Sequence, residues 1–320
     1  MENLTLLSDL ANDTLIGLSS KSKYLLSKYF YDDTGSSIFQ DIMKMPEYYL
    51  TGCEYEIFNT HKDQIVEEFI KDDPVFNLFE LGSGDGLKTK ILLKLLVVRA
   101  LSLRYIPIDI SAKTNNDLEK SLARELPTLK VKAETGDFFR VIKRLNDYSG
   151  KKKVILFLGS NIGNFQDEEL NNFLSHLSEF TNADDIVMIG FDLKKTPEII
   201  LAAYNDRAGH TRRFNMNYLA RLNRELGADF NLDNFDQQSV YNPQSGKVKS
   251  FLVSKKEQSV HIEALGKTFR FARWEAVLME VSRKFSLETI ENYAATNGFR
   301  VVKHFRDRKN WFTDSLWIKK

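Results

Sequence analysis

Short apolar runs alternate with helical patterns through the middle of the chain, and this alternation constrains the fold more than any other feature. The segments succeed one another in this order: Val75–Leu81, Thr89–Leu101, Tyr105–Ile108, Ala112–Glu125, Val131–Ala133, Phe138–Leu145, Val154–Leu158, Glu168–Phe180 and Ile186–Gly190. Successive strand–helix–strand units build a mainly parallel sheet with helices on both faces. We therefore expect a doubly wound α/β sheet that binds its ligands beyond the carboxyl ends of the strands.

The segments on either side of this region predict a smaller α+β lobe. Residues 24–58 are rich in aromatic and small polar residues, which is typical of helices packed on a core. Residues 196–234 follow an amphipathic helical pattern, and residues 239–282 contain the alternation of antiparallel strands. The tail from Glu288 predicts a helix, a glycine stop and two strands. We expect a core formed by residues 57–195 and 285–320, and a second lobe formed by residues 1–56 and 196–284.

The charge balance disfavours a polyanionic partner. The chain carries 45 basic and 44 acidic residues, a formal net charge of +1. No field strong enough to gather nucleic acid or an anionic membrane follows from this balance, so we expect a small-molecule substrate. The one long basic run, Lys151–Lys153, precedes an apolar stretch, and we interpret it as the solvated entrance to a strand.

Cysteine content and hydropathy indicate where the protein works. Cys53 is the only cysteine, so no intrachain disulfide forms, and the five histidines lack the spacing of a zinc site. No stretch reaches the ~18 apolar residues of a membrane span, and residues 1–18 do not have the pattern of a signal peptide. We expect a monomeric, cytoplasmic protein with no bound metal and no membrane association.

A glycine-rich segment directly after the first expected strand indicates the cofactor. Glycines 82, 84 and 86 follow Glu80 with the spacing Gly-x-Gly-x-Gly, where the chain must turn sharply before a helix. A dinucleotide-binding loop instead requires Gly-x-Gly-x-x-Gly to bring a pyrophosphate to the helix N-terminus. The observed spacing resembles the nucleoside-binding turn of class I methyltransferases. It favours S-adenosylmethionine (SAM) over NAD, with contacts from Gly82, Ser83 and Gly84.

Two further acidic residues follow the next two expected strands. Asp109 ends the second strand, where a carboxylate can accept hydrogen bonds from both ribose hydroxyls. Asp137 follows the third strand and is next to Phe138, which suits contacts with the amino group and the face of adenine. A single such acid is more often a helix cap or a surface charge. Their order after successive strands favours cofactor binding.

The segment after the fourth expected strand contains a candidate substrate ligand. Asn164 lies in Gly159–Phe165, a position where this fold commonly presents groups to the methyl acceptor. Its amide can bind an amine or a carboxylate. The alternative is that it only caps the turn before the helix that starts near Asp167.

Six motifs in order resemble the histidine-specific Nα-methyltransferases, a family that forms hercynine on the way to ergothioneine. They are Tyr31-Asp32-x-x-Gly35-Ser36-x-x-Phe39, Pro46-Glu47-Tyr48-Tyr49-x-Thr51-x-x-Glu54, Glu80-Leu81-Gly82-Ser83-Gly84, Gly159-Ser160-x-Ile162-Gly163-Asn164-Phe165, Ala220-Arg221-Leu222-Asn223-Arg224-Glu225-Leu226-Gly227-Ala228 and Glu280-x-Ser282-x-Lys284-Phe285. The resemblance covers almost the whole chain. It implies a class I methyltransferase core closed by a C-terminal antiparallel hairpin, with SAM as methyl donor and S-adenosylhomocysteine (SAH) as product.

The resemblance also implies roles for individual residues. Cofactor contacts would come from Tyr31, Gly82, Lys88, Asp109, Asp137 and Phe138. The substrate carboxylate would be bound by Asn164 and Tyr204, the imidazole by Tyr48, Glu280 and Ser282, and the pocket lined by Phe39, Gly159 and Asn161. Tyr48 and Asn164 would be the catalytic residues, with Tyr48 or water taking the proton that leaves the amine.

Two departures from the family pattern leave the substrate open. Asn161 stands where the family usually has threonine, and Ser250 stands where a methionine commonly covers the imidazole. Loss of that apolar wall would widen the pocket, so a different amino acid or a tryptophan-like amine remains an alternative. A non-catalytic binding module is an alternative of another class. The carboxylates of Asp109 and Asp137 argue against this alternative.

Overall fold

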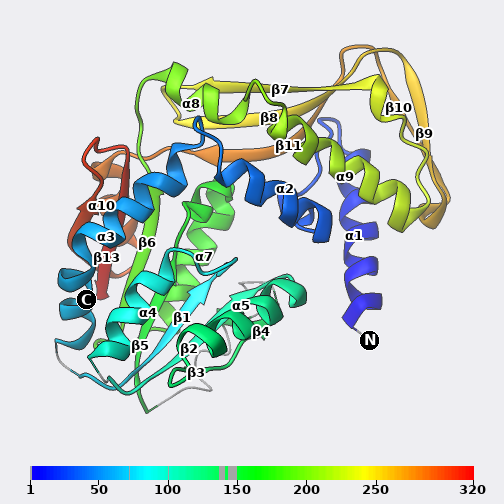
Figure 1. Ribbon diagram of the computed structural model, residues 1–320. Helices are drawn as coiled ribbons and strands as arrows, with labels where there is room; N and C mark the ends of the chain where they lie inside the picture. Colours follow the sequence, from blue (N-terminus) through cyan, green and yellow to red (C-terminus); the bar gives the residue numbers. More distant parts are fainter. Residues whose placement is uncertain (1, 72, 100, 137–140, 143–149) are drawn as a thin grey trace. The chain divides into compact units, whose positions relative to one another are not determined.

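The computed structural model describes residues 2–71, 73–99, 101–136, 141–142 and 150–320, and its chain divides into two compact units (Figure 1). The sheet unit comprises residues 50–194 and 284–320, and the flanking unit comprises residues 1–49 and 195–283. Residues 50–56, which we expected in the second lobe, belong to the sheet unit. They lie in α3 (Tyr49–Ile70), a single continuous helix.

The sheet unit is built on one eight-stranded sheet, which confirms the class I α/β fold. Its strands are β1 (Phe76–Leu81), β2 (Leu103–Asp109), β3 (Lys130–Val131), β4 (Glu134–Thr135), β5 (Lys152–Phe157), β6 (Ile186–Asp192), β12 (Phe299–Arg306) and β13 (Phe312–Lys319). The strand order is β12-β13-β6-β5-β1-β2-β3, and β4 also pairs with β2. The strands from β1 to β6 pair in parallel, whereas β13 runs antiparallel to both β6 and β12. The expected C-terminal hairpin is thus confirmed.

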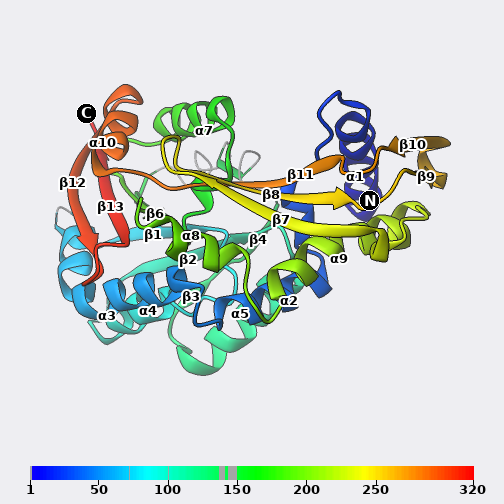
Figure 2. The same ribbon diagram turned by 90° about the horizontal axis from the view of Figure 1, so that it is seen from above.

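Helices cover both faces of this sheet. They are α3, α4 (Thr89–Val98), α5 (Ala112–Glu125), α7 (Asp167–Glu179) and α10 (Leu287–Thr296). Figure 2 shows α7 and α10 on one face and α3, α4 and α5 on the other. Because both faces are covered, β1, β5 and β6 are buried at every residue instead of alternating. Among the helices of the described residues, none has the length and apolar character needed to cross a bilayer.

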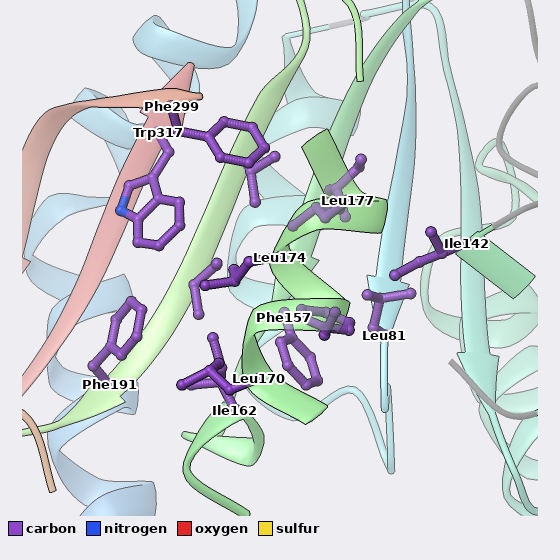
Figure 3. Close-up of a cluster of buried hydrophobic side chains, with 14 of the residues drawn as sticks. Leu81, Ile142, Phe157, Ile162, Leu170, Leu174, Leu177, Phe191, Phe299 and Trp317 are labelled. Carbon is purple, nitrogen blue, oxygen red and sulfur yellow. The ribbon is translucent and has the colours of Figure 1, made fainter. Parts of the chain in front are cut away.

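A hydrophobic core cluster of the sheet unit lies between α7 and the sheet (Figure 3). Leu170, Leu174 and Leu177 recur at helical spacing along α7 and are fully buried, in one cluster with Phe157 of β5 and Phe191 of β6. Burial of each such side chain contributes roughly 1.5–3 kcal/mol. This packing fixes the carboxyl ends of β5 and β6, where the expected substrate loop begins.

The lysine run at the start of β5 is not the solvated entrance that we expected. Lys151 is exposed, but Lys152 and Lys153 are only 6% and 1% exposed. The strand lies between β1 and β6, so its first residues are already covered. Lys153 is accommodated because its Nζ lies 2.8 Å from Oδ2 of the buried Asp185. A buried partner of opposite charge therefore overrides the preference of lysine for solvent.

The flanking unit combines helices with two small antiparallel sheets. Its elements are α1 (Glu2–Ser19), η1 (Ser27–Phe30), α2 (Asp33–Met43), α8 (Pro197–Tyr204), α9 (His210–Leu226), η4 (Leu232–Asn234), β7 (Phe235–Asn242), β8 (Lys247–Ser254), β9 (Gln258–Ile262), η5 (Glu263–Leu265), β10 (Lys267–Phe271) and β11 (Ala276–Arg283). The strand orders are β11-β8-β7 and β10-β9. Burial alternates along β7 because one face of its sheet packs on the core, which is shared with α1, α2 and α9.

Candidate functional site

The glycine segment after β1 forms a tight turn at the carboxyl end of that strand. Gly82 and Gly84 have φ values of 74° and 54°, which only glycine adopts without strain. The N–H groups of Gly82 and Ser83 donate to the carbonyl oxygen of Ile108 at 2.8 and 3.2 Å. A Cβ placed on Gly84 would meet no atom within 4 Å, so the backbone there borders open space. The turn is therefore fixed to β2 and accessible to a ligand.

Asp109 ends β2 directly beside this turn. Its Oδ2 accepts a hydrogen bond from the Gly84 N–H at 3.1 Å, and its Oδ1 accepts one from the Ser111 N–H at 2.9 Å. Burial raises the pKa of the Asp109 carboxyl, and these backbone hydrogen bonds oppose the shift. Each carboxylate oxygen retains a second lone pair. The side chain can therefore accept further hydrogen bonds from a pair of neighbouring hydroxyls such as those of ribose.

The expected adenine contacts, Asp137 and Phe138, lie outside the described residues. The chain just before them runs beside Asp109: β4 pairs with the end of β2, and the Gly136 N–H donates to the Asp109 carbonyl oxygen at 3.0 Å. Their role as adenine contacts remains a prediction.

Glu80 joins the elements around the turn. Its carboxyl is 2% exposed, accepts a hydrogen bond from Thr89 Oγ1 of α4 at 2.6 Å, and accepts another from the Tyr105 hydroxyl of β2. Burial raises the pKa of Glu80 to about 7, against the opposing effect of these two hydrogen bonds. The acid that precedes the glycines thus fixes β1, β2 and α4 to one another.

The loop after β5 has an unusual backbone. Gly159 and Ser160 have φ values of 72° and 58°, and the chain then forms the short helix η3 (Asn161–Asn164). The Asn161 amide donates to the Leu158 carbonyl oxygen at 3.0 Å, which braces the turn. The N-terminus of α7 is capped by Gln166, whose backbone N–H is bound by the Glu169 side chain at 2.8 Å. Gln166, not Asn164, is therefore the N-cap of α7, and the role of Asn164 as a substrate ligand stays a prediction.

Lys88 lies at the start of α4, and its ammonium pairs with the buried carboxylate of Glu54. Burial alone would lower the pKa of Lys88, but the negative charge of Glu54 outweighs this effect and raises it. Lys88 is therefore a permanent cation on the sheet unit. The motif that contains Glu54 was noted in the sequence, but nothing in the sequence assigned a role to its carboxylate.

In the flanking unit, Tyr204 and Ser282 are in direct contact. The Tyr204 hydroxyl donates to Ser282 Oγ at 2.8 Å, and both side chains are buried. Glu280 and Ser282 are two residues apart on β11, so their side chains leave the strand on the same side. The structure thus groups three of the residues expected to bind the substrate.

Ser250 lies on β8 opposite Glu280, and opposite Ser239 of β7. The Ser239 and Ser250 hydroxyl oxygens are 3.2 Å apart, and Ser239 Oγ also donates to the Tyr204 carbonyl oxygen at 3.0 Å. A polar row of side chains therefore crosses the three strands. The sequence singled out Ser250 but not Ser239, because only the strand register pairs them.

Tyr31, Phe39 and Tyr48 belong to one aromatic cluster of the flanking unit. Phe39 packs edge-on against Tyr31 and Tyr48, with ring centroids 5.4 and 6.1 Å apart. Phe214 of α9 completes the cluster at 5.7 Å from Phe39 and 5.6 Å from Tyr31. Phe214 was missed, although its place on the apolar face of the amphipathic pattern marks it as a core residue.

The predicted site residues therefore form two groups, each described within its own unit. The sheet unit contains Gly82, Ser83, Gly84, Lys88, Asp109, Gly159, Asn161 and Asn164. The flanking unit contains Tyr31, Phe39, Tyr48, Tyr204, Ser250, Glu280 and Ser282.

Comparison with known proteins gives concordant matches over both units. A family model described as "Histidine-specific methyltransferase, SAM-dependent" matches residues 10–319. The histidine N-alpha-methyltransferase of Mycolicibacterium smegmatis is 34% identical over 310 residues, which are 97% of this chain and 95% of that protein. The enzyme of the same name from Mycobacterium tuberculosis is 33% identical with the same coverage. Ergothioneine biosynthesis protein 1 of Schizosaccharomyces pombe is 27% identical over 314 residues, which are 95% of this chain and 40% of that protein.

Proposed function

The chain belongs to the family of SAM-dependent, histidine-specific methyltransferases, and on that premise we propose that it methylates the α-amino nitrogen of L-histidine. The product of three transfers is Nα,Nα,Nα-trimethylhistidine, hercynine, an intermediate of ergothioneine biosynthesis, and each transfer releases SAH. The observation that carries the proposal is the family match along residues 10–319, which includes the cofactor turn and every substrate motif.

The cofactor role of the sheet unit follows from its polar groups. The Asp109 carboxylate would bind the ribose hydroxyls, next to the backbone of Gly82, Ser83 and Gly84. The Lys88 ammonium is suited to a negatively charged group, and the methionyl part of SAM has a carboxylate. Asp137 and Phe138 would bind adenine.

The imidazole role of Glu280 and Ser282 follows from their hydrogen-bonding chemistry. A neutral imidazole has one N–H donor and one acceptor nitrogen. Glu280 can accept from the N–H, and Ser282 can donate to the other nitrogen. Because Ser282 Oγ already accepts the Tyr204 proton, its own hydrogen is oriented away from Tyr204. We propose that this arrangement selects histidine, with the Tyr204 hydroxyl orienting Ser282 toward the imidazole.

Methyl transfer to the amine depends mainly on positioning. The sulfonium is already an activated electrophile, and alignment of amine and methyl at ~3–3.5 Å can supply roughly 7–11 kcal/mol of the barrier. The attacking amine must be neutral, and the α-ammonium pKa of ~8 falls further beside a sulfonium in a buried site. The proton would leave through water or the Tyr48 hydroxyl.

Successive methylation requires that the growing cation remains bound. Aromatic faces such as that of Phe39, which lies beside Tyr31 and Tyr48, favour a quaternary ammonium by ~0.5–2 kcal/mol. Trimethylation is therefore compatible with the cluster.

Ser250 favours one alternative substrate class. Its small side chain, 1% exposed, stands opposite Glu280 and leaves no large apolar wall at this position. A larger aromatic amine such as tryptophan is the second candidate.

The test is incubation of the protein with SAM and each amino acid in turn, followed by mass spectrometry of the products. We expect histidine to gain one, two and then three methyl groups, each of which replaces a hydrogen of the α-amino group. Methylated tryptophan in the absence of methylated histidine would establish the alternative. Absence of any methyl transfer despite SAM binding would favour a non-catalytic module.

A further inference from the structure

The carboxylate of Glu54 is buried at the carboxyl ends of the central strands. It accepts hydrogen bonds there from two predicted site residues, Lys88 and Gly159. Glu54 lies in α3 with its side chain 1% exposed. Its Oε1 and Oε2 accept the Gly159 N–H at 2.8 and 3.1 Å, and Oε2 also accepts a hydrogen bond from the Lys88 ammonium. One carboxylate thus links the loop after β5 to the start of α4.

The sheet is shaped to admit this carboxylate. Gly190 of β6 faces it, and a Cβ added at Gly190 would lie 2.5 Å from Glu54 Oε1, closer than real Cβ atoms approach an oxygen. Gly190 pairs in register with Asp314 of β13. The Cβ of an alanine would therefore occupy space that Glu54 needs, although the backbone conformation does not require glycine there.

Asp314 is a second buried acid that acts on Glu54. It is completely buried, and among the described residues no donor reaches either of its carboxyl oxygens. Burial, the negative charge of Glu54 and a hydrogen bond to Glu54 raise the pKa of Asp314 well above its usual value. The raised pKa favours the neutral form of Asp314, whose O–H can donate to the Glu54 carboxylate.

Glu54 and Lys88 are the ion pair at the centre of this group of side chains. Glu54 accepts hydrogen bonds from the Gly159 N–H and the Lys88 ammonium, and Asp314 and Glu80 are further acids that raise the pKa of Lys88. A Cβ on Gly159 would be 3.6 Å from Lys88 Nζ, so the ammonium lies directly against this backbone. The Lys88 side chain is 19% exposed, which leaves part of it accessible to a ligand.

We propose that Glu54 is a positioning residue for methyl transfer that fixes the Lys88 ammonium and the Gly159 amide where the cofactor binds. The inference rests on the proposed function for the role of Lys88 and Gly159. The network itself depends only on the contacts within the sheet unit. Glu54 acts through Lys88 and does not touch the reacting atoms.

The test is calorimetric binding of SAH to the full chain without any amino acid. Glu54→Gln removes the charge that orients Lys88, and we expect the Kd for SAH to rise at least tenfold. Glu56→Gln is the matched control, because Glu56 lies on the same helix and pairs with Arg308 at the surface, 2.7 Å away. It should leave the Kd for SAH within twofold of the parent value.

Further variants separate positioning from folding. If Glu54 acts through Lys88, a Glu54→Gln/Lys88→Met double variant binds SAH no more than twofold more weakly than Lys88→Met alone. If the two substitutions instead raise the Kd for SAH by factors that multiply in the double variant, the inference is overturned. Gly190→Ala leaves every polar group in place but displaces the carboxylate, so it should weaken SAH binding at least threefold, and it remains informative if Glu54→Gln fails to fold.

The neutral state of Asp314 has its own test. Asp314→Asn keeps a donor toward Glu54 and should preserve the melting temperature, whereas Asp314→Leu removes the donor and should lower it. An equal loss in both variants would contradict a neutral Asp314. Parent protein that binds no SAH would refute the proposed function, whereas parent and Glu54→Gln proteins that bind SAH equally would refute only the positioning role.

Discussion

Replacement of Asp109 by asparagine should selectively weaken cofactor binding. The variant keeps the shape of the side chain but loses the charge that accepts from the Gly84 N–H, 3.1 Å away, and that would accept from the ribose hydroxyls. Hydrogen bonds to a charged group contribute about 1.5–3 kcal/mol, against about 0.5–1.5 kcal/mol for neutral pairs. If both hydrogen bonds to ribose weaken by this difference, the free energy of SAH binding becomes less favourable by about 2–3 kcal/mol. The Kd for SAH then rises roughly 30- to 150-fold.

The assay is titration calorimetry with SAH near pH 7.5, with melting curves to confirm that the variant is folded. Asp117→Asn, an exposed site on α5, is the control and should not change the Kd. The KM for the amino acid at saturating SAM should also remain close to that of the parent protein. A Kd for SAH within threefold of the parent value would refute the assignment of Asp109 to ribose.

Three further predictions concern the substrate, the fold and pH. Glu280→Ala should raise the KM for histidine by roughly 10- to 100-fold, because it removes a hydrogen bond to a charged group that contributes about 1.5–3 kcal/mol. An unchanged KM would contradict the imidazole assignment. Lys284→Met leaves the fully buried Asp192 without its ammonium partner 2.8 Å away and should cost about 3–5 kcal/mol in urea unfolding. Lys284→Met/Asp192→Leu should cost less, so an equal or larger loss would count against the ion pair. Because burial raises the pKa of Glu80 from 4.5 to about 7, the protonated form favours the folded state, and stability should fall as pH rises from about 4.5 to about 7. Relative to Glu80→Gln, the parent protein should lose on the order of 3 kcal/mol between pH 4.5 and 8, and parallel pH profiles would disprove this.

The order of elements in the sheet unit could be predicted because its signals are local. The expected segments 75–81 and 112–125 correspond to β1 and α5 within one residue at each end. The burial of Lys152 and Lys153 was not predictable in the same way. It depends on the position of β5 between two strands, and for Lys153 on Asp185, which is 32 residues further along the chain.

The site could be predicted where its residues share one edge of a parallel sheet. The turn after β1 and Asp109 at the end of β2 meet because neighbouring parallel strands end at the same edge, and the Gly84–Asp109 contact follows from this. The partners of Glu54 could not be found in this way. They are contributed by α4, the loop after β5 and β13, and only tertiary packing brings them to one carboxylate.

Ser239 and Phe214 show the same limit in the flanking unit. Ser239 meets Ser250 through the register of β7 and β8, which depends on the length of the turn that joins these strands. Phe214 joins Phe39 because α9 packs against α2. Periodicity identifies such residues as buried but does not identify their neighbours.

The most direct test of the central claim is a crystal structure of the protein with SAH and L-histidine bound. We predict that the ribose hydroxyls lie within hydrogen-bond distance of the Asp109 carboxylate. We also predict that the imidazole nitrogens lie within hydrogen-bond distance of Glu280 and Ser282. Ribose bound elsewhere, or histidine bound without contact to Glu280 and Ser282, would contradict the central claim.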